Sequence, residues 1–209
     1  MTPKEIIAHL DELYPDAHCE LVHRNNYEMA VAVVLSAQTT DASVNKVTPA
    51  LFEKYPDAES LAKADISDIE DSIRTLGLYR NKAKSIHEMA KGMTERFHGE
   101  VPQTMKELTS LAGVGRKCAN VILAECYNIP SLAVDTHVNR IAKRLGLAKR
   151  DDTLLQVETK LKRKIPRDRW IKCHHQMIFF GRYRCKSRNP DCTGCPFMDI
   201  CKYRKGKVK

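Results

Sequence analysis

Apolar positions along the chain recur at the three- and four-residue spacing of amphipathic helices, and almost no segment alternates as a strand would. Residues that favour helix starts or stops accompany this spacing, namely Thr2 before Pro3, Asp65, Asn81 and Gly146. The pattern predicts an all-α protein of short packed helices. We expect helices over residues 3–14, 27–37, 43–55, 58–63, 66–75, 81–97, 104–112, 116–127, 136–145, 153–164 and 170–181.

The apolar content does not predict a membrane protein. The longest apolar run, MAVAVVL at Met29–Leu35, is far shorter than the roughly 20 residues that cross a bilayer. The N-terminal stretch MTPKEIIAHLDELYP has the pattern of an amphipathic helix and lacks the apolar core of a signal peptide. We therefore expect a cytoplasmic protein with no membrane contact, associated with the nucleoid if its source is bacterial.

The positive charge is concentrated in one part of the chain. The net charge is +9, yet residues 140–209 hold 21 Lys and Arg against 6 Asp and Glu, whereas residues 1–139 hold 14 against 20. Such asymmetry favours a polyanionic partner, most simply nucleic acid, because each neutralised phosphate releases counterions. A solvated basic face that only improves solubility is the alternative, and charge alone does not separate the two.

Half of the eight cysteines fall in a short C-terminal segment. They have the spacing C-x6-C-x2-C-x5-C, at Cys185, Cys192, Cys195 and Cys201. Because structural disulfides are rare in the cytoplasm, we interpret them as metal ligands. Zinc sites usually use two C-x2-C pairs, so the uneven gaps favour a [4Fe–4S] cluster, with zinc as the alternative. We expect the others to be small buried side chains: Cys19, Cys118, Cys126 and Cys173.

The stretch LAGVGRKCANVI at 111–122 places two glycines between two apolar helix patterns. Glycine tolerates positive φ, so the stretch predicts a helix–hairpin–helix. The start of its second helix can bind a DNA phosphate through backbone amides, without reading sequence. We expect the DNA contacts here at Leu111, Gly113, Gly115 and Arg116. An ordinary αα-hairpin with a glycine turn is the alternative.

The run LAGVGRKCANVILAECYNIPSLAVDTHVNRIAKRLG resembles the helix–hairpin–helix and Gly/Pro–Asp signature of base-excision DNA glycosylases. The stretches LSAQTTDASVNK at 35–46 and TLGLYRNKA at 75–83, with the cysteine spacing, are similar to the endonuclease III family in particular. This resemblance runs nearly end to end. It implies a six-helix barrel over residues 21–132, a cluster domain of residues 1–20 with 133–209, and a DNA cleft between them.

The activity that the resemblance implies is that of a bifunctional DNA glycosylase and abasic-site lyase of base excision repair. Such an enzyme removes oxidised pyrimidines from double-stranded DNA, and we expect it to act as a monomer. A monofunctional adenine-mismatch glycosylase shares this architecture but lacks the hairpin lysine. A non-enzymatic DNA-binding protein with a structural metal would explain the charge and the cysteines. It would leave the pairing of Lys117 with Asp135 without a purpose.

Lys117 is the catalytic amine that the resemblance implies. Its attack on the sugar C1′ expels the base and forms a Schiff base that promotes β-elimination. The amine must be neutral to attack, and both the helix N-terminus and Arg116 disfavour the ammonium form. Lys82 follows a similar turn, LGLYR, and we expect it to be a phosphate contact or a plain surface charge.

Asp135 in AVDTHVNRI precedes a helix, so its residue type predicts an N-cap. The resemblance adds a catalytic role, because a carboxylate near the reacting sugar stabilises oxocarbenium character and assists proton transfer. We assign His137 no catalytic role. It is within helical reach of Asp135, but a histidine in this position is more often a structural hydrogen-bonding residue.

The resemblance also implies residues that handle an extruded base. Gln38 matches the family's gap-filling residue and Leu78 its wedge. Their alternatives are a polar residue at a helix C-terminus and a core leucine. In the KSRNPD loop, Lys186 and Arg188 are candidates for phosphate contact, although Asp191 weakens the positive charge there.

Overall fold

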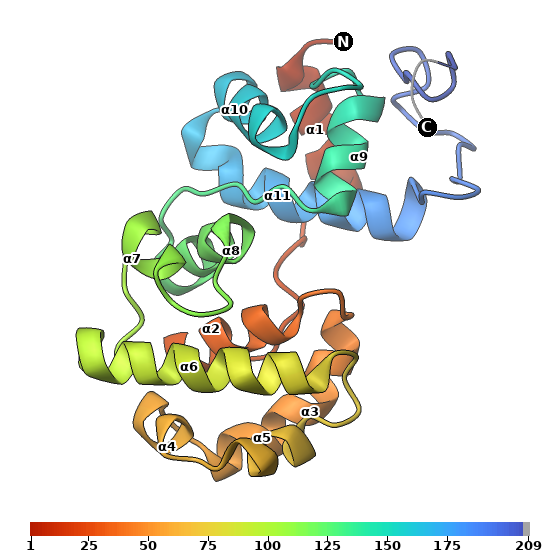
Figure 1. Cartoon of the computed structure of the whole chain (residues 1–209). Helices are drawn as coiled ribbons and strands as arrows, with labels where there is room; N and C mark the ends of the chain where they lie inside the picture. The colour runs from red at the N-terminus through yellow and green to blue at the C-terminus, as the bar shows by residue number, and fades with distance from the viewer. Residues whose placement is uncertain (207–209) are drawn as a thin grey trace. The chain divides into compact units, whose positions relative to one another are not determined.

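The computed structural model describes residues 1–206 and confirms the all-α prediction, because this part of the chain contains helices and no β-strand (Figure 1). The chain divides into two compact units. One is continuous, Glu20–Ile129, and the other combines Met1–Cys19 with Pro130–Lys209. None of the helices within residues 1–206 has the length and apolar character that a membrane span requires.

The unit Glu20–Ile129 is organised around one buried helix, α2. Every side chain from Met29 to Leu35 is buried, which agrees with the unbroken apolar run of the sequence. Helices α3, α6 and α8 pack against α2, and α4 and α5 pack against α6 (Figure 1). The bounds are α2 (Asn26–Leu35), α3 (Asp41–Lys54), α4 (Ala58–Ala62), α5 (Ile66–Ser72), α6 (Tyr79–Phe97), α7 (Met105–Thr109) and α8 (Arg116–Tyr127).

The other unit joins the first helix of the chain to the last ones. Helix α11 packs against α1 and α9, and α9 packs against α10. The Asp11 carboxylate of α1 accepts hydrogen bonds from Arg169 Nη2 at 2.5 Å and Gln176 Nε2 at 2.9 Å. The bounds are α1 (Pro3–Leu13), α9 (Thr136–Arg144), α10 (Leu154–Lys164), a 3-10 turn η1 (Arg167–Arg169), α11 (Trp170–Phe179) and a π-helical turn η2 (Phe180–Arg184).

Most of the helix-boundary predictions are confirmed by the capping geometry. Thr2 caps α1 in a reciprocal capping box with Glu5, and Asp65 caps α5. Gly146 follows α9 with a φ of +73°. The Asn81 cap was wrong, because α6 already begins at Tyr79 after a left-handed residue. Helix α7 ends at Thr109 instead of residue 112, because residues 110–115 form the hairpin turn.

Candidate functional site

The predicted helix–hairpin–helix is present, with α7 and α8 joined by a turn over residues 110–115. Gly113 has a φ of +74°, which L side chains rarely adopt. A Cβ added there would lie 2.9 Å from Ser85 Cβ and 3.0 Å from Val34 Cγ1. The turn therefore requires glycine at position 113 for its backbone conformation and for its close approach to α2 and α6.

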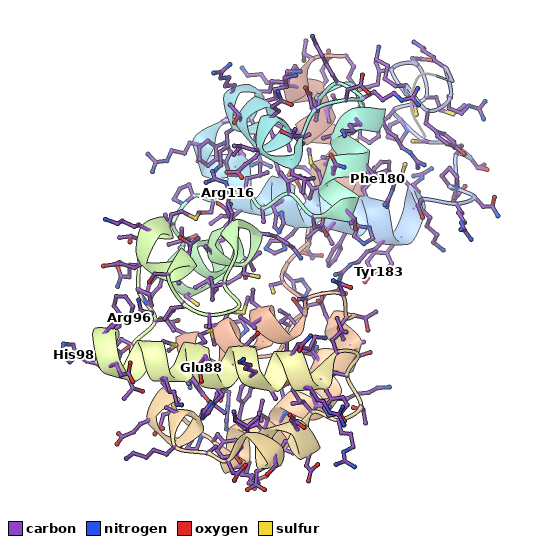
Figure 2. All side chains as sticks on the ribbon, viewed as in Figure 1. Glu88, Arg96, His98, Arg116, Phe180 and Tyr183 are labelled. Atoms are coloured by element: carbon purple, nitrogen blue, oxygen red, sulfur yellow. The ribbon has the colours of Figure 1, made fainter. Side chains whose placement is uncertain are left out.

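Gly115 contributes differently from Gly113. Its φ of −82° and ψ of 175° are extended, and it is the N-cap residue of α8. A Cβ added to it would meet no described atom within 4 Å. Helix α8 therefore starts, within the described residues, at an open position without a side-chain cap. The orphan amides of a helix N-terminus are favourable partners for an anion, and Arg116 is exposed at this end of the helix (Figure 2).

The apolar residues of the hairpin anchor it instead of facing solvent. Leu111 and Val114 are each 4% exposed, and the Val114 amide donates to the Leu111 carbonyl at 3.2 Å. The side chain of Leu111 belongs to the core of its unit. Any contact between Leu111 and DNA would therefore come from its backbone. The DNA contact expected at this residue from the sequence is limited accordingly to backbone atoms.

Lys117 is an exposed amine at the second residue of α8. The next residue, Cys118, turns inward, and burial raises the pKa of its thiol, an effect that the Lys117 charge partly opposes. The local fold therefore exposes Lys117 and partly buries Cys118. Within its own unit, Lys117 is accessible to a ligand that approaches the start of α8.

Asp135 caps α9, as its sequence context predicts. Its Oδ1 accepts a hydrogen bond from the Val138 amide at 2.7 Å. His137 is held by Arg140, whose Nη2 lies 3.2 Å from His137 Nδ1 and donates to the Gly181 carbonyl at 2.8 Å. Burial lowers the pKa of His137, and the Asp135 charge opposes this. His137 thus has structural contacts, which agrees with giving it no catalytic role.

Gln38 and Leu78 share an uncommon backbone conformation. Both are exposed and left-handed, with φ of 54° at Gln38 and 59° at Leu78. Leu78 is 57% exposed, so the alternative of a core leucine was wrong. Gln38 lies three residues beyond the end of α2. Each side chain is therefore presented by a sharp turn on the surface of the unit.

Lys82 differs from its prediction. It is only 5% exposed, and its Nζ donates a hydrogen bond to Thr39 Oγ1. Burial lowers the pKa of the Lys82 amine. The expectation of a plain surface charge was wrong, because Lys82 lies on the inner face of α6. Its hydrogen bond connects α6 to the turn that carries Gln38.

The four clustered cysteines surround one small cavity, which Arg144 and Phe197 also line. Within residues 1–206, no three His, Cys, Asp or Glu side chains converge on a single metal position. The cysteines thus share one space without meeting at one point. Four thiols around a cavity are nevertheless the donor set that holds a [4Fe–4S] cluster, so the residues present fit this group. The four are Cys185, Cys192, Cys195 and Cys201.

Arg144 supports this segment and was not singled out from the sequence. It is 1% exposed, and its Nη1 lies 3.2 Å from Cys185 Sγ and 2.8 Å from the Lys186 carbonyl oxygen. Its Nη2 donates to the Ser187 carbonyl at 3.1 Å, and its guanidinium stacks 4.1 Å from the Tyr203 ring centroid. The sequence did contain a signal for its burial, because Arg144 follows Ile141 by three residues and so lies on the same buried face of α9.

Lys186 and Arg188 are exposed on the loop between the first two clustered cysteines. Asp191, expected to weaken this loop's contact with DNA, has a structural use, because its Oδ1 accepts from the Thr193 amide at 3.1 Å. Among the remaining cysteines, Cys173 is fully buried, and burial raises its pKa to about 11. The other three are half-buried: Cys19, Cys118 and Cys126.

Comparison with known proteins shows the family. Residues 31–167 match the model of the HhH-GPD superfamily base excision DNA repair proteins. Endonuclease III of Bacillus subtilis (strain 168) is 46% identical over 205 residues, which cover 96% of this chain and 94% of the relative. Endonuclease III of Synechocystis sp. (strain ATCC 27184 / PCC 6803 / Kazusa) is also 46% identical, over 198 residues that cover 94% and 90%.

Comparison with solved structures leads to the same family as comparison with the sequences of relatives. A trapped covalent intermediate of endonuclease III with DNA, described as an estranged-adenine complex, matches with a TM-score of 0.94 and 46% identity, covering all of both chains. A thermostable thymine-DNA glycosylase at 20% identity matches with a TM-score of 0.85 over 98% of this chain and 97% of its own, which shows a shared fold. The chain therefore belongs to the HhH-GPD superfamily of base excision DNA repair proteins and, within it, to the endonuclease III family.

Proposed function

We propose that Lys117 supplies the amine through which this protein, a DNA glycosylase and abasic-site lyase of base excision repair, removes a damaged base and cuts the strand. The observation that carries this proposal is an exposed lysine at the open start of α8, directly after the glycine hairpin. The endonuclease III structure at 46% identity was trapped as a covalent intermediate with DNA, which supports a nucleophilic amine.

The chemistry follows from the amine. Lys117 Nζ attacks C1′ of the damaged nucleotide, the bond from C1′ to the base breaks, and the base leaves with the bonding electrons and takes up a proton. Loss of a proton from the nitrogen opens the sugar ring to a Schiff base. Removal of a proton from C2′ then expels the 3′ phosphate by β-elimination. Hydrolysis of the Schiff base releases the lysine.

Asp135 is proposed to assist these steps through its carboxylate. One oxygen accepts the cap hydrogen bond from Val138, so the other can stabilise positive charge on the sugar and move protons. The cap fixes the carboxylate at the first turn of α9. One residue thereby has two compatible roles, as a helix cap and as a catalytic group.

Asp135→Asn is expected to slow turnover by about 10²–10³-fold while DNA binding and thermal stability change little. The amide oxygen still accepts from Val138, so the cap remains and only the charge is lost. Single-turnover cleavage of an oxidised-pyrimidine duplex measures this effect. Asp65→Asn removes the same charge from the cap of α5 and is expected to keep full turnover. Equal slowing by both variants would contradict the catalytic role of Asp135.

The substrate we propose is an oxidised pyrimidine in double-stranded DNA. The open start of α8 and the exposed loop residues Lys186 and Arg188 suit phosphates and read no sequence. Gln38 and Leu78 are proposed to fill the gap and separate the stack when the base is extruded. Both are exposed on left-handed turns, where a side chain can enter DNA without disturbing the core.

Leu78→Ala is expected to reduce processing of a paired lesion about tenfold more than processing of the same lesion opposite a gap. The wedge matters most where the base stack resists opening, which costs a few kcal/mol. Because Leu78 is 57% exposed, thermal stability should stay unchanged. Leu154→Ala, which truncates a leucine that is 55% exposed on α10, is the matched control. Equal losses on both substrates would argue against a wedge.

The cofactor we propose is a [4Fe–4S] cluster held by the four cysteines around the cavity. When bound, the cluster would cross-link four points of the 185–201 segment, and its role is structural. The exposed Lys186 and Arg188 lie inside this segment, so a fixed loop would present both cations to phosphate. We further propose that the protein acts as a monomer in the cytoplasm, at the nucleoid if its source is bacterial.

Strand nicking tests the proposed function directly. The purified protein, incubated with a duplex that contains one abasic site, is expected to cut the strand at that site and leave a 3′ unsaturated aldehyde. A protein that only binds DNA would leave the strand intact. A glycosylase without lyase activity would release the base from a damaged duplex, and the strand would break only after alkali treatment. That result would exclude Lys117 as a Schiff-base nucleophile.

A further inference from the structure

A strongly basic pocket lies in the unit that contains α9 and α10, and none of the residues assigned above to the chemistry lines it. It is lined by the end of α9, the loop over residues 146–150, α10 and Lys202, and its volume is about 610 Å³. That volume falls within the ~300–1,000 Å³ of typical ligand sites. Seven lysines and arginines line it, a third of the 21 that lie in residues 140–209.

Three of these lysines have structural tasks. Lys143 Nζ donates to the Asp152 carbonyl at 3.0 Å, and Lys160 Nζ lies 2.6 Å from the Asp152 carboxylate. Lys164 Nζ donates to the Leu147 carbonyl at 2.8 Å. The Lys160 hydrogen bond lowers the pKa of Asp152, which therefore stays negative. Together these contacts hold the loop between α9 and α10 in place.

The side chains of the other cations of the pocket form no hydrogen bond with a described residue, although the charge of Lys149 helps to lower the pKa of Asp152. Among the described residues, no carboxylate forms an ion pair with their side chains, which are Lys149, Arg150, Arg163 and Lys202. Cations near a helix C-terminus are stabilised by the helix dipole, which accounts for Arg163 in the last turn of α10. The dipole of α10 does not account for Lys149 and Arg150, which lie on the loop, or for Lys202. The lining of the pocket contains seven lysines and arginines and no Asp or Glu.

The floor of the pocket cannot bind an anion through its backbone. The amides of Leu147 and Ala148 donate to the Ala142 carbonyl at 2.8 and 3.1 Å, and the Gly146 amide donates to the Lys143 carbonyl at 3.2 Å. The amides of residues 146–148 are therefore already used, and recognition depends mainly on the charged side chains. Flexible cations around an open space suit several negative charges at close spacing, instead of one small anion in a fixed cradle.

We propose that this basic pocket binds a run of closely spaced phosphates. A nucleic-acid backbone outside the catalytic site and the free polyphosphate tail of a nucleotide present the same chemistry. Guanidinium groups such as Arg150 and Arg163 match phosphate oxygens with two parallel hydrogen bonds. The site is independent of the roles proposed for Lys117 and Asp135.

Two matched variants of the full-length protein test the pocket. Lys149→Ser with Arg163→Ser removes one lysine and one arginine from the pocket, both of them exposed. Lys4→Ser with Arg167→Ser removes the same two charge types from exposed positions of the same unit that do not line it. Circular dichroism and thermal melting verify that both variants keep the fold.

Inorganic tripolyphosphate at low salt is the first probe, measured by calorimetry. We expect the wild type and the control variant to bind it and the pocket variant to bind about tenfold more weakly. Unchanged binding by the pocket variant, or no binding by the wild type, would overturn the proposal. Equal competition by poly-glutamate at matched charge would overturn it too, because the pocket would then select acidic protein instead of phosphate.

Undamaged duplex DNA is the second probe and identifies the source of the phosphates. If the source is nucleic acid, the pocket variant lowers the slope of log K against log salt by about 2, one unit for each lost phosphate contact, and the control variant does not. An unchanged slope with weakened tripolyphosphate binding assigns the pocket to a free polyphosphate. Nicking of abasic DNA by the wild type tests the proposed function separately. Failure of the pocket proposal can therefore be distinguished from failure of the proposed function.

Discussion

Lys117→Ala should give no covalent protein–DNA adduct when an abasic or oxidised-pyrimidine duplex is treated with borohydride. Borohydride reduces the Schiff base between the lysine and C1′, so trapping reports the nucleophile itself. Strand cleavage should disappear with the adduct, a loss greater than about 10⁴-fold, because α8 carries no lysine other than Lys117. Binding to undamaged DNA should weaken only slightly, since Lys117 is one exposed cation among many. Gel analysis of the adduct and DNA anisotropy measure the two effects.

Two other lysines provide the controls for this result. Lys106→Ala removes an exposed amine from α7, the first helix of the same hairpin, and should trap as well as the wild type. Lys82→Met removes the buried amine with little change in volume, and it too should give the adduct, with any loss of yield no larger than its loss of folded protein. An adduct that persists in Lys117→Ala and vanishes in Lys82→Met would mean that the nucleophile is Lys82, after the LGLYR turn, and not Lys117.

Cys195→Ser is expected to remove the cluster, the order of the 185–201 segment and tight DNA binding together. Metal binding and folding are coupled in small sites whose ligands come from an irregular segment, so loss of one ligand costs much of that folding free energy. The wild type should be yellow-brown, with four iron and four sulfide ions per chain, as expected of a single cubane cluster. Iron and sulfide analysis, limited proteolysis of the tail and DNA anisotropy measure the three losses.

Cys126→Ser is the matched control for the cluster. Its thiol lies on α8 and donates to the Asn26 carbonyl at 3.7 Å, a bond that a hydroxyl can replace. Colour, iron content and DNA binding should all remain. Stoichiometric zinc with no visible absorbance in the wild type would overturn the cluster. A Cys195→Ser protein with an intact tail and full DNA affinity, but no turnover, would move the cluster from structure to chemistry.

Helix positions followed from the sequence because the apolar spacing determines which face of each helix is buried. The start of α6 did not. Asn81 looked like a cap by its residue type, yet the chain enters the helix at Tyr79 from a left-handed Leu78. A left-handed leucine, with a φ of 59°, is uncommon, and residue type does not predict it. The same limit applies to α7, which ends early because Gly113 turns the chain against α2 and α6.

The sequence predicted the glycine hairpin and the grouping of the four cysteines, because in both segments the spacing of the residues is itself the signal. The burial of Lys82 was not predicted, because a lysine by type belongs on the surface and only its bond to Thr39 explains its place. Arg144 was missed for the same reason. Its buried guanidinium satisfies carbonyls of residues 185–187, which lie more than 40 positions along the chain. The local spacing places Arg144 on the buried face of α9, but it does not show which remote carbonyls the guanidinium binds.

The pairing of α1 with α11 determines when this unit can form during synthesis. The hydrogen bond between Asp11 and Gln176 joins residues 165 positions apart, so at about 5–20 residues per second roughly 8–33 s separate their translation. Helices α2 to α8 are synthesised within that interval, while Ile6, Ile7 and Leu10 remain without their final cover. The first helix made is therefore among the last to be buried, and a chain that stops before Trp170 keeps an apolar face available for aggregation or for a chaperone.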